Sequence, residues 1–245
     1  MSEVKPRTHV VLTGLDYERI EHGLRMYPGY RVWVVKNANP KKEHLALVEE
    51  IDKDILKILE SLGYKQENIG FWPVDFYHFD QALVSIYELL LREKKQGREV
   101  IVNITSGTKP VSIAATLAAA LAKCGVVYFS ARKYIRKVNE IVSEGVIPEP
   151  IVIAPLFELA DVLLPRSKEK IRIILRLLSG KAKNVTEIIR GEEKPLKKDI
   201  AKYTYYVNEL AREKLIDIRK DGISLTELGK LVGMLVKKTE ELEQK

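Results

Sequence analysis

The sequence predicts an α/β domain built on a doubly wound, mostly parallel sheet, followed by a smaller α+β domain. The first 155 residues alternate short apolar runs, rich in β-branched residues, with longer stretches of helical periodicity. The apolar runs are hydrophobic almost throughout, which is typical of parallel strands covered on both faces. From residue 167 the order changes to three helical stretches, two short alternating strands and a final helix.

Five strands and four helices account for most of the first domain. The strands are predicted at 9–13, 31–36, 69–74, 99–104 and 125–130, and the helices at 16–27, 41–62, 78–96 and 110–123. The second helix shows the spacing clearly, because one stripe is apolar and Gly63 ends it. The residues of this stripe are Leu45, Val48, Ile51, Ile55, Ile58, Leu59 and Leu62. Regular alternation of this kind predicts a Rossmann-like sheet.

After residue 130 the pattern becomes polar and alternating, and then apolar again. We expect an added hairpin-like edge element, formed by 131–142 and 151–154 around a turn at 145–150. A short connecting helix is expected at 156–164. The predicted organisation is therefore a first domain at 1–155, a linker at 156–166 and a second domain at 167–245.

The second domain has the element order of a winged helix-turn-helix. Ser167 caps a first helix that Gly180 ends, and a short second helix starts at Asn184 or Thr186. A third helix is expected at 196–214. The strands at 215–220 and 222–225 flank Asp221-Gly222, a strong hairpin signal, and Thr226 opens the last helix.

The net charge of +7 is unevenly distributed. Residues 1–165 hold 21 Lys+Arg and 21 Asp+Glu, whereas residues 166–245 hold 20 and 13, so the last third carries the whole excess. Basic charge confined to one small domain indicates a polyanion-binding surface. The alternative is an ordinary solvated helical face.

The polar face of the third helix and the hairpin turn are the candidate contacts with double-stranded DNA. Lysines on such a face neutralise phosphates, and Thr, Tyr and Asn can bond phosphates or base edges. The candidate residues are Lys197, Lys198, Lys202, Thr204, Tyr205, Asn208, Arg219 and Lys220. A domain of this type can also bind protein, and its tyrosines can simply pack. Residues 208–216 and 225–230 resemble prokaryotic winged-helix transcription regulators, which implies a dimer on a roughly palindromic operator.

Other classes of protein are disfavoured by what the sequence lacks. The one cysteine, Cys124, has no partner for an internal disulfide, and no Cys/His grouping has metal-ligand spacing. No apolar stretch approaches the length of a membrane span, and the N-terminus has no signal-peptide pattern. We therefore expect a cytoplasmic protein with no membrane association, no cofactor and no metal.

Two loops of the first domain are candidate ligand contacts, because ligands of open parallel sheets bind beyond the carboxyl ends of the strands. The first loop follows the first strand and contains Thr13, Gly14 and Asp16. The second loop, 103–109, follows the fourth strand. Its glycine lets the backbone approach a ligand, its hydroxyls are polar contacts, and the helix start with its lysine attracts anions. The alternative is a turn that merely joins strand to helix.

The common nucleotide motifs are missing from both loops. No Gly-x-Gly-x-x-Gly follows the first strand, and Gly107-Thr108-Lys109 lacks the upstream glycine of a Walker loop. Dinucleotide redox chemistry and ATP hydrolysis are therefore not expected.

The second loop, Asn103-Ile104-Thr105-Ser106-Gly107-Thr108-Lys109, resembles the Asn-x-Thr-Gly-Gly-Thr-Lys signature of CARF domains, the CRISPR-associated Rossmann-fold sensors. With a winged helix behind it, the chain is similar to archaeal CRISPR-associated transcription regulators of antiviral defence. The resemblance implies a homodimer with one shared pocket for a cyclic oligoadenylate, the tetra-adenylate being favoured. The implied contacts are Thr13, Gly14, Asp16, Asn103, Thr105, Ser106, Gly107, Thr108 and Lys109. Ser106 departs from the signature, where a glycine is usual.

Whether the protein is also an enzyme is left open by the sequence. His9, His22, His44 and His78 are scattered and lack the paired spacing of an acid–base or metal site. Some CARF domains slowly cleave their own ligand through its 2′-hydroxyl, and on that resemblance Lys109, Ser106 and Thr13 would be the residues involved. Three hypotheses follow: a ligand-responsive DNA-binding regulator, which we favour, a ring nuclease with a DNA-binding appendage, and a ligand-gated adaptor that binds protein.

Overall fold

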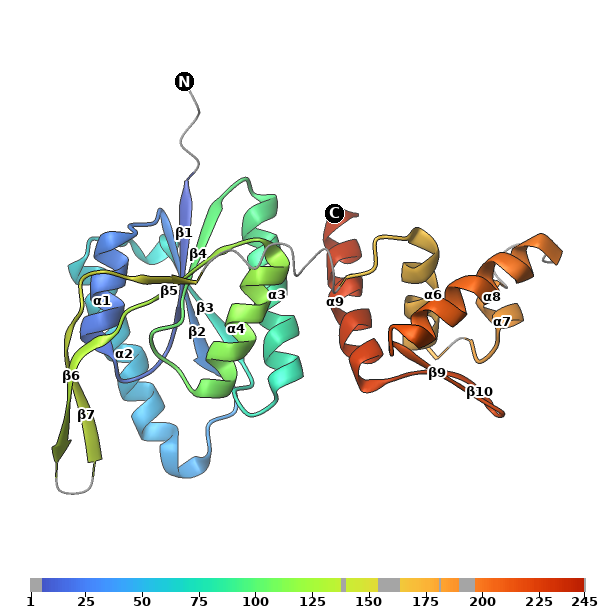
Figure 1. The fold of residues 1–245 in the computed structure, drawn as a ribbon. Coiled ribbons are helices and arrows are strands. Elements are labelled where there is room, and N and C mark those ends of the chain that lie inside the picture. The colour runs from blue at the N-terminus through green and yellow to red at the C-terminus, as the bar shows by residue number, and fades with distance from the viewer. Residues whose placement is uncertain (1–5, 138–139, 154–163, 181, 190–196, 245) are drawn as a thin grey trace. The chain divides into compact units, whose positions relative to one another are not determined.

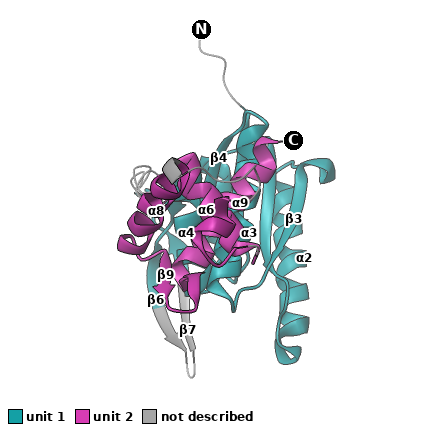
Figure 2. Ribbon diagram, turned by 90° about the vertical axis from the view of Figure 1, so that its right-hand side faces the viewer, with its two compact units in different colours: residues 1–158 teal, residues 159–245 magenta. Residues whose placement is uncertain are grey.

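The structure is a computed structural model that describes residues 6–137, 140–153, 164–180, 182–189 and 197–244. The chain forms two compact units, unit 1 (residues 1–158) and unit 2 (residues 159–245), which Figure 2 shows in different colours. Each unit contains its own cluster of buried hydrophobic residues.

Unit 1 is built on a six-stranded sheet in the order β3-β2-β1-β4-β5-β8 (Figure 1). Its strands are β1 (Arg7–Leu12), β2 (Arg31–Asn37), β3 (Ile69–Val74), β4 (Glu99–Asn103), β5 (Gly125–Tyr128) and β8 (Ile151–Ile153). The first five strands are parallel, and β8 pairs with β5 in the antiparallel direction. The mostly parallel, Rossmann-like sheet predicted from the sequence is confirmed.

Helices cover both faces of this sheet. They are α1 (Tyr17–Met26), α2 (Leu45–Ser61), α3 (Phe79–Lys95) and α4 (Lys109–Ala122), with short 3-10 turns η1 (Lys42–His44) and η2 (Gln66–Asn68). Successive side chains of a strand point to opposite faces. In β1, Val11 therefore packs with the α1 and α2 side, and Thr8 meets Glu93 of α3 on the other side.

The alanine-rich helix α4 packs along α3 (Figure 1). Ala115, Ala118, Ala119 and Ala122 are all buried. Small side chains allow two helix axes to approach closely, which explains why the sequence is so rich in alanine here.

Glu93 of α3 is the centre of a buried polar network beneath the sheet. Its carboxylate accepts hydrogen bonds from Thr8 Oγ1 at 2.7 Å, Trp33 Nε1 at 2.9 Å and Arg98 Nη1 at 2.5 Å. Arg31 Nη1 lies 3.7 Å away. Burial raises the pKa of Glu93, but the bonds from Thr8, Arg98 and Trp33 outweigh burial and lower it. The carboxylate is therefore kept charged inside the fold.

His9 of β1 is a buried structural histidine. Its Nδ1 donates to the carbonyl oxygen of Tyr27 at 3.0 Å. Burial lowers the pKa of His9 to about 4, so the imidazole is neutral near pH 7.

The expected edge hairpin is wrong in its pairing. Strand β6 (Ala131–Lys137) pairs with β7 (Glu140–Val146) as a separate two-stranded ribbon, and β8 joins the main sheet beside β5. The physical reason is polarity. The alternating polar strands can form a ribbon exposed to water, whereas the apolar β8 extends the apolar sheet. The expected connecting helix at 156–164 lies almost wholly outside the described residues.

Unit 2 contains the helix, helix, helix, hairpin, helix order expected from the sequence. Its elements are α6 (Lys168–Leu178), α7 (Val185–Ile189), α8 (Lys197–Arg212), β9 (Ile216–Arg219), β10 (Gly222–Leu225) and α9 (Glu227–Glu243). Three helices have caps that the sequence predicts, since Ser167 Oγ accepts from Lys170 N, Asn184 Oδ1 accepts from Glu187 N and Thr226 Oγ1 accepts from Gly229 N.

The core of unit 2 draws on each of the helices that the structure describes there. Ile174 of α6, Ile188 of α7, Val207 and Leu210 of α8 and Val232 of α9 are all buried in one cluster. The small hairpin β9–β10 pairs antiparallel beside this cluster. The face of α8 opposite this cluster is exposed to solvent.

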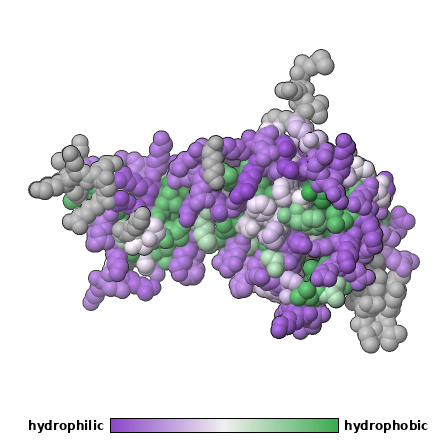
Figure 3. Space-filling model, turned by 180° about the vertical axis from the view of Figure 1, so that it is seen from behind, coloured by the Kyte–Doolittle hydropathy of each residue, from purple (hydrophilic) through white to green (hydrophobic). Residues whose placement is uncertain are grey.

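The described surface is largely hydrophilic. On the face shown in Figure 3, hydrophobic residues are visible only in separate patches between hydrophilic ones. Within the described residues, no helix combines the length and the apolar character that crossing a membrane requires.

Candidate functional site

The two predicted loops meet at the point where the strand order reverses. From β1 the chain leads outward to β2 and β3 on one side, and it returns to β4 and β5 on the other (Figure 1). The first loop (13–16) leaves the end of β1, and the second loop (103–109) leaves the end of the adjacent β4. We call this edge of the sheet the carboxyl edge. A reversal of strand order opens a crevice there that suits a ligand.

The first and second loops are in direct contact through glycines. A methyl group added at Gly14 would overlap Ser106 Oγ and would lie 2.8 Å from the backbone nitrogen of Gly107. Gly107 itself has φ of +92°, a conformation that other residues rarely adopt. Glycine is therefore required at both positions for the loops to approach each other as they do.

Asn103 and Thr105 lie inside the second loop. The Asn103 side-chain oxygen accepts from Thr105 N at 3.0 Å, and the Thr105 hydroxyl accepts from Phe129 N at 3.0 Å. Both residues are buried, and so is Thr13 at the end of β1. Asn103 and Thr105 therefore hold the second loop in shape, and the roles of all three residues toward a ligand stay predictions.

Ser106 is buried to 2% exposure, and its hydroxyl makes no hydrogen bond within the described part of the chain. Its backbone carbonyl accepts from Ser112 Oγ at 3.3 Å. A buried hydroxyl without a partner costs about 1–3 kcal/mol. Such a cost suggests a group that is held ready for another partner.

Gly107, Thr108 and Lys109 are exposed residues at the start of α4. Thr108 is the N-cap residue, but its side chain makes no capping bond, and Pro110 follows within the first turn. The first amides of a helix attract anions, and Lys109 adds a full positive charge. No carboxylate in the described residues pairs with Lys109. We call residues 106–109 with these amides the anion cradle.

Asp16 is already engaged within the chain. Its carboxylate forms an ion pair with the buried Arg19, which also donates from Nη1 to the carbonyl of Phe129 at 3.2 Å. A cavity of about 220 Å³ adjoins this pair, and it is lined by Leu15, Asp16, Tyr17, Glu18, Arg19 and Gly145. Asp16 therefore shapes the start of α1, and a direct contact with a ligand would have to compete with Arg19.

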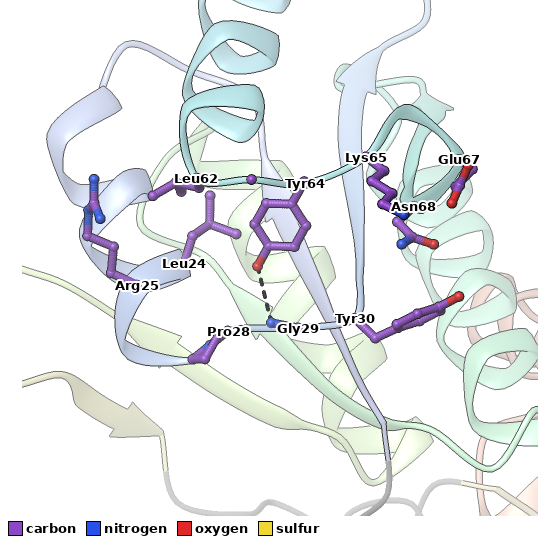
Figure 4. A pocket seen from close by; sticks show the side chains of 11 residues that line it. Leu24, Arg25, Pro28, Gly29, Tyr30, Leu62, Tyr64, Lys65, Glu67 and Asn68 are labelled. Carbon is purple, nitrogen blue, oxygen red and sulfur yellow. Dashed lines mark hydrogen bonds between the residues drawn. The ribbon is translucent and has the colours of Figure 1, made fainter.

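A larger cavity of about 630 Å³ lies at the opposite edge of the sheet, before β2 and β3 (Figure 4). Tyr30, Lys65 and Asn68 are among its lining residues, and Gly29 N donates to Tyr64 Oη at 3.1 Å across it. We call this the amino-edge cavity. It has neither a reversal of strand order nor a long helix starting at it, so we place the candidate site at the carboxyl edge despite the difference in volume.

Sequence reasoning missed a pair of residues at the end of β3. His78 Nδ1 lies 3.0 Å from Asp75 Oδ2, just before α3 begins. The available signal was Asp-x-x-His directly after a predicted strand.

The described candidate DNA contacts on α8 share one exposed face. Lys202, Thr204, Tyr205 and Asn208 are exposed, whereas the helix buries Tyr203, Val207 and Leu210 on its other side. This division confirms the burial pattern expected from the helical spacing. Lys197 and Lys198 are the first residues of α8, and their side chains are outside what the structure describes.

Most of these polar groups already have partners in unit 2. Lys202 Nζ lies 2.6 Å from Glu169 and lowers the pKa of that carboxyl to about 2. Tyr205 Oη donates to Glu209 at 2.9 Å, and Arg219 pairs with Asp217 at 3.0 Å. Exposed pairs of this kind contribute about 0–1 kcal/mol, so they exchange readily for phosphate.

The described side chains add no reactive thiol and no metal-binding group to the candidate site. Burial raises the pKa of Cys124 to about 12, so its thiol is not a nucleophile near neutral pH. Within the described residues, no three His, Cys, Asp or Glu side chains are grouped to hold a metal ion.

Comparisons with known proteins complete the description of the site. The family model described as "HFX_2341_N:-like, N-terminal" matches residues 7–140. No curated protein matches the sequence. Three solved structures are remotely similar, and this chain spans only part of each of them.

The first is Can2 from Sulfobacillus thermosulfidooxidans in complex with cyclic tetra-adenylate, at 15% identity and a TM-score of 0.40, covering 96% of this chain and 65% of that chain. The second is protein VC1899 from Vibrio cholerae, at 13% identity and a TM-score of 0.44, covering 97% of this chain and 68% of that chain. The third is Enterococcus italicus Csm6 bound to cyclic hexa-2′-fluoro-hexa-dAMP, at 14% identity and a TM-score of 0.42, covering 98% of this chain and 54% of that chain.

Proposed function

This chain belongs to the family described as "HFX_2341_N:-like, N-terminal", and we propose that it is a ligand-responsive, DNA-binding transcriptional regulator. Its first domain, residues 1–155, binds a cyclic oligoadenylate, with the tetra-adenylate favoured. A linker at 156–166 joins it to a winged helix-turn-helix at 167–245 that binds double-stranded DNA. The protein acts as a cytoplasmic homodimer and regulates CRISPR-associated genes.

The contact between Gly14 and the turn Ser106–Gly107 is the observation that carries the ligand-binding half. It brings the backbone of both loops together under the first amides of α4, beside Lys109. Such an arrangement suits the phosphates of a nucleotide, because amides and lysine supply donors and positive charge. The choice of a cyclic oligoadenylate rests on the likeness of 103–109 to the CARF signature.

The DNA-binding half rests on the coincidence of element order and charge. The excess of positive charge lies in the last 80 residues, which hold α6 to α9 with the β9–β10 hairpin. The exposed face of α8 would enter the major groove, and Arg219 and Lys220 would meet the backbone from the hairpin. Ligand in the shared pocket would shift the population of dimers toward one spacing of the two winged helices, which changes operator affinity.

Lys109→Ala and Lys202→Ala are expected to separate the two halves. Removing Lys109 deletes one charged contact with the ligand, so binding of cyclic tetra-adenylate should weaken about 10- to 100-fold while DNA binding in its absence is unchanged. Removing Lys202 should leave ligand binding intact and reduce the salt slope of DNA binding by about 1. Calorimetry and fluorescence anisotropy measure the two affinities.

Lys65→Ala is the matched control, because Lys65 is an exposed lysine that lines the amino-edge cavity. It should change neither affinity. If Lys65→Ala weakened ligand binding and Lys109→Ala did not, the ligand would bind at the amino-edge cavity and not at the carboxyl edge. If Lys109→Ala impaired DNA binding in the absence of ligand, the assignment of ligand binding to the first domain and DNA binding to the second would be wrong.

The ion pairs on unit 2 favour a second candidate function, a ligand-gated adaptor whose winged helix binds protein. Pairs such as Lys202 with Glu169 and Arg219 with Asp217 reduce the net positive charge of the α8 face and hairpin. A salt titration of DNA binding decides between the two. If unit 2 neutralises several DNA phosphates, the logarithm of the binding constant falls with the logarithm of salt concentration, with a slope of about −0.9 for each phosphate. An adaptor that binds protein gives no measurable DNA binding at any salt concentration.

A further inference from the structure

The first turn of α6 is joined to α8 by two charged side chains. α6 packs against α8 within unit 2 (Figure 2). Glu169 Oε1 lies 2.6 Å from Lys202 Nζ. The adjacent Lys170 Nζ lies 3.1 Å from Glu209 Oε2 and 2.6 Å from Glu213 Oε1. The contacts at 202 and 209 are about 10 Å apart along α8, so a single turn of α6 is fixed at two points of the candidate DNA helix.

Lys170 is the structural member of this contact. Its side chain is 14% exposed, and two carboxylates face its ammonium group. A shielded pair is screened by salt much less than an exposed one. Lys170 therefore holds the start of α6 against the end of α8, and Glu169 stays beside α8 without depending on its own ion pair.

The carboxylate of Glu169 is held in one orientation. Ser167 Oγ donates to Oε2 at 2.9 Å, while Lys202 Nζ donates to Oε1 at 2.6 Å. Its position in the first turn of α6 also places it at the positive end of the helix dipole. The carboxylate thus presents a fixed, negatively charged oxygen to Lys202, which is the kind of partner that a DNA phosphate offers to a lysine.

Other polar groups on the exposed face of α8 are also bonded within unit 2. Tyr205 Oη donates to Glu209 at 2.9 Å, and Thr204 Oγ1 donates to the carbonyl oxygen of Ile200 at 2.7 Å. Glu209 is in turn held by Lys170. With the lysine pair described above, three of the four exposed candidate contacts on α8 have internal partners. DNA would have to replace such bonds when it binds this face.

We propose that Glu169 is an autoinhibitory residue, which pairs with Lys202 in place of a DNA phosphate and lowers the affinity of unit 2 for DNA. The inference rests on the proposed function for its DNA partner, and it adds a residue that regulates that binding. The Lys202 side chain is 51% exposed, so a phosphate can reach the ammonium group and replace the carboxylate. The replaced carboxylate remains close to the phosphate, and the two like charges repel each other.

The test compares the full-length wild type with Glu169→Gln by fluorescence anisotropy. The probe is a labelled DNA duplex of mixed sequence, about 30 base pairs or about three helical turns long. The variant should bind this duplex about 3- to 10-fold more tightly, because the competing ion pair and the repulsion are both removed. Glutamine can still accept from Ser167 Oγ, so circular dichroism should show unchanged helix content. The affinity for cyclic tetra-adenylate should also be unchanged.

Glu213→Gln is the matched control, because it removes the same charge from another carboxylate that lies 2.6 Å from a lysine. That lysine is Lys170, which keeps its contact with Glu209 in the variant and is not a candidate DNA contact. DNA affinity should change by less than about twofold. Equal tightening in the two variants would mean that only the net charge of unit 2 matters, and it would overturn the inference.

The remaining results separate this inference from the proposed function. If the wild type binds DNA and Glu169→Gln binds it equally or more weakly, the inference is wrong and the proposed function stands. If neither protein binds the duplex at low salt, the inference fails together with the DNA-binding half of the proposed function.

Discussion

Gly14→Ala is expected to weaken the binding of cyclic tetra-adenylate about 10- to 100-fold. The added methyl group would overlap Ser106 Oγ, which can rotate, and would lie 2.8 Å from the backbone nitrogen of Gly107, which cannot move alone. Overpacking of this kind costs about 1–3 kcal/mol, and here it displaces the turn that presents the anion cradle. Calorimetric titration of the variant measures the loss.

Two further variants make the result specific. Gly125→Ala adds a methyl in β5 whose nearest neighbour is 3.6 Å away, an ordinary contact, so ligand binding should be unchanged. Adding Ser106→Ala to Gly14→Ala removes the hydroxyl overlap but keeps the close approach to Gly107, so it should restore only part of the affinity. Wild-type affinity in Gly14→Ala would show that the contact between the loops is irrelevant to the ligand.

Glu93→Gln is expected to destabilise unit 1 by about 3–5 kcal/mol, because it removes a buried charge and leaves the partly buried Arg98 without its ion-pair partner. The carboxylate accepts from Thr8, Trp33 and Arg98, and an NH2 group in place of either carboxylate oxygen would face Trp33 Nε1 or Arg98 Nη1, which are both donors. Urea unfolding followed by tryptophan fluorescence reports on this unit alone, since Trp33 and Trp72 are the only tryptophans and both belong to it.

The control for this prediction is Glu99→Gln. Glu99 pairs with Arg7 at 2.8 Å but is half exposed, so its loss should cost no more than about 1 kcal/mol. The pH dependence has a definite sign. The pKa of Glu93 in the folded state lies below its ordinary value of 4.5, so its stabilisation is present above that pH and is lost as the pH falls through the folded pKa. Equal losses in the two variants would refute the buried network.

The main sheet and its helices could be predicted because each element keeps one hydrophobic pattern along its whole length. The apolar runs of β1, β2 and β4 are hydrophobic on both faces, and the α2 stripe of Ile51, Ile55 and Leu59 has one period throughout. The β6–β7 ribbon could not be predicted in the same way. Its register depends on which strand pairs with which, and alternation along 131–142 fits several partners equally well.

The candidate site could be predicted in position and only partly in chemistry. Topology alone brings the ends of β1 and β4 together, so both loops could be named from their sequence positions. Which side chains face inward could not be read from residue types. The hydroxyl of Thr105 accepts from Phe129 N, and Asp16 is paired with Arg19.

Hydrogen exchange with and without cyclic tetra-adenylate tests the central claim most directly, because it shows at which edge of the sheet the ligand binds. The account predicts slower exchange at residues 14–16 and 106–109, where the first loop and the anion cradle meet. Slower exchange at residues 28–30 and 64–68, around the amino-edge cavity, would contradict it. So would unchanged exchange along the whole of unit 1.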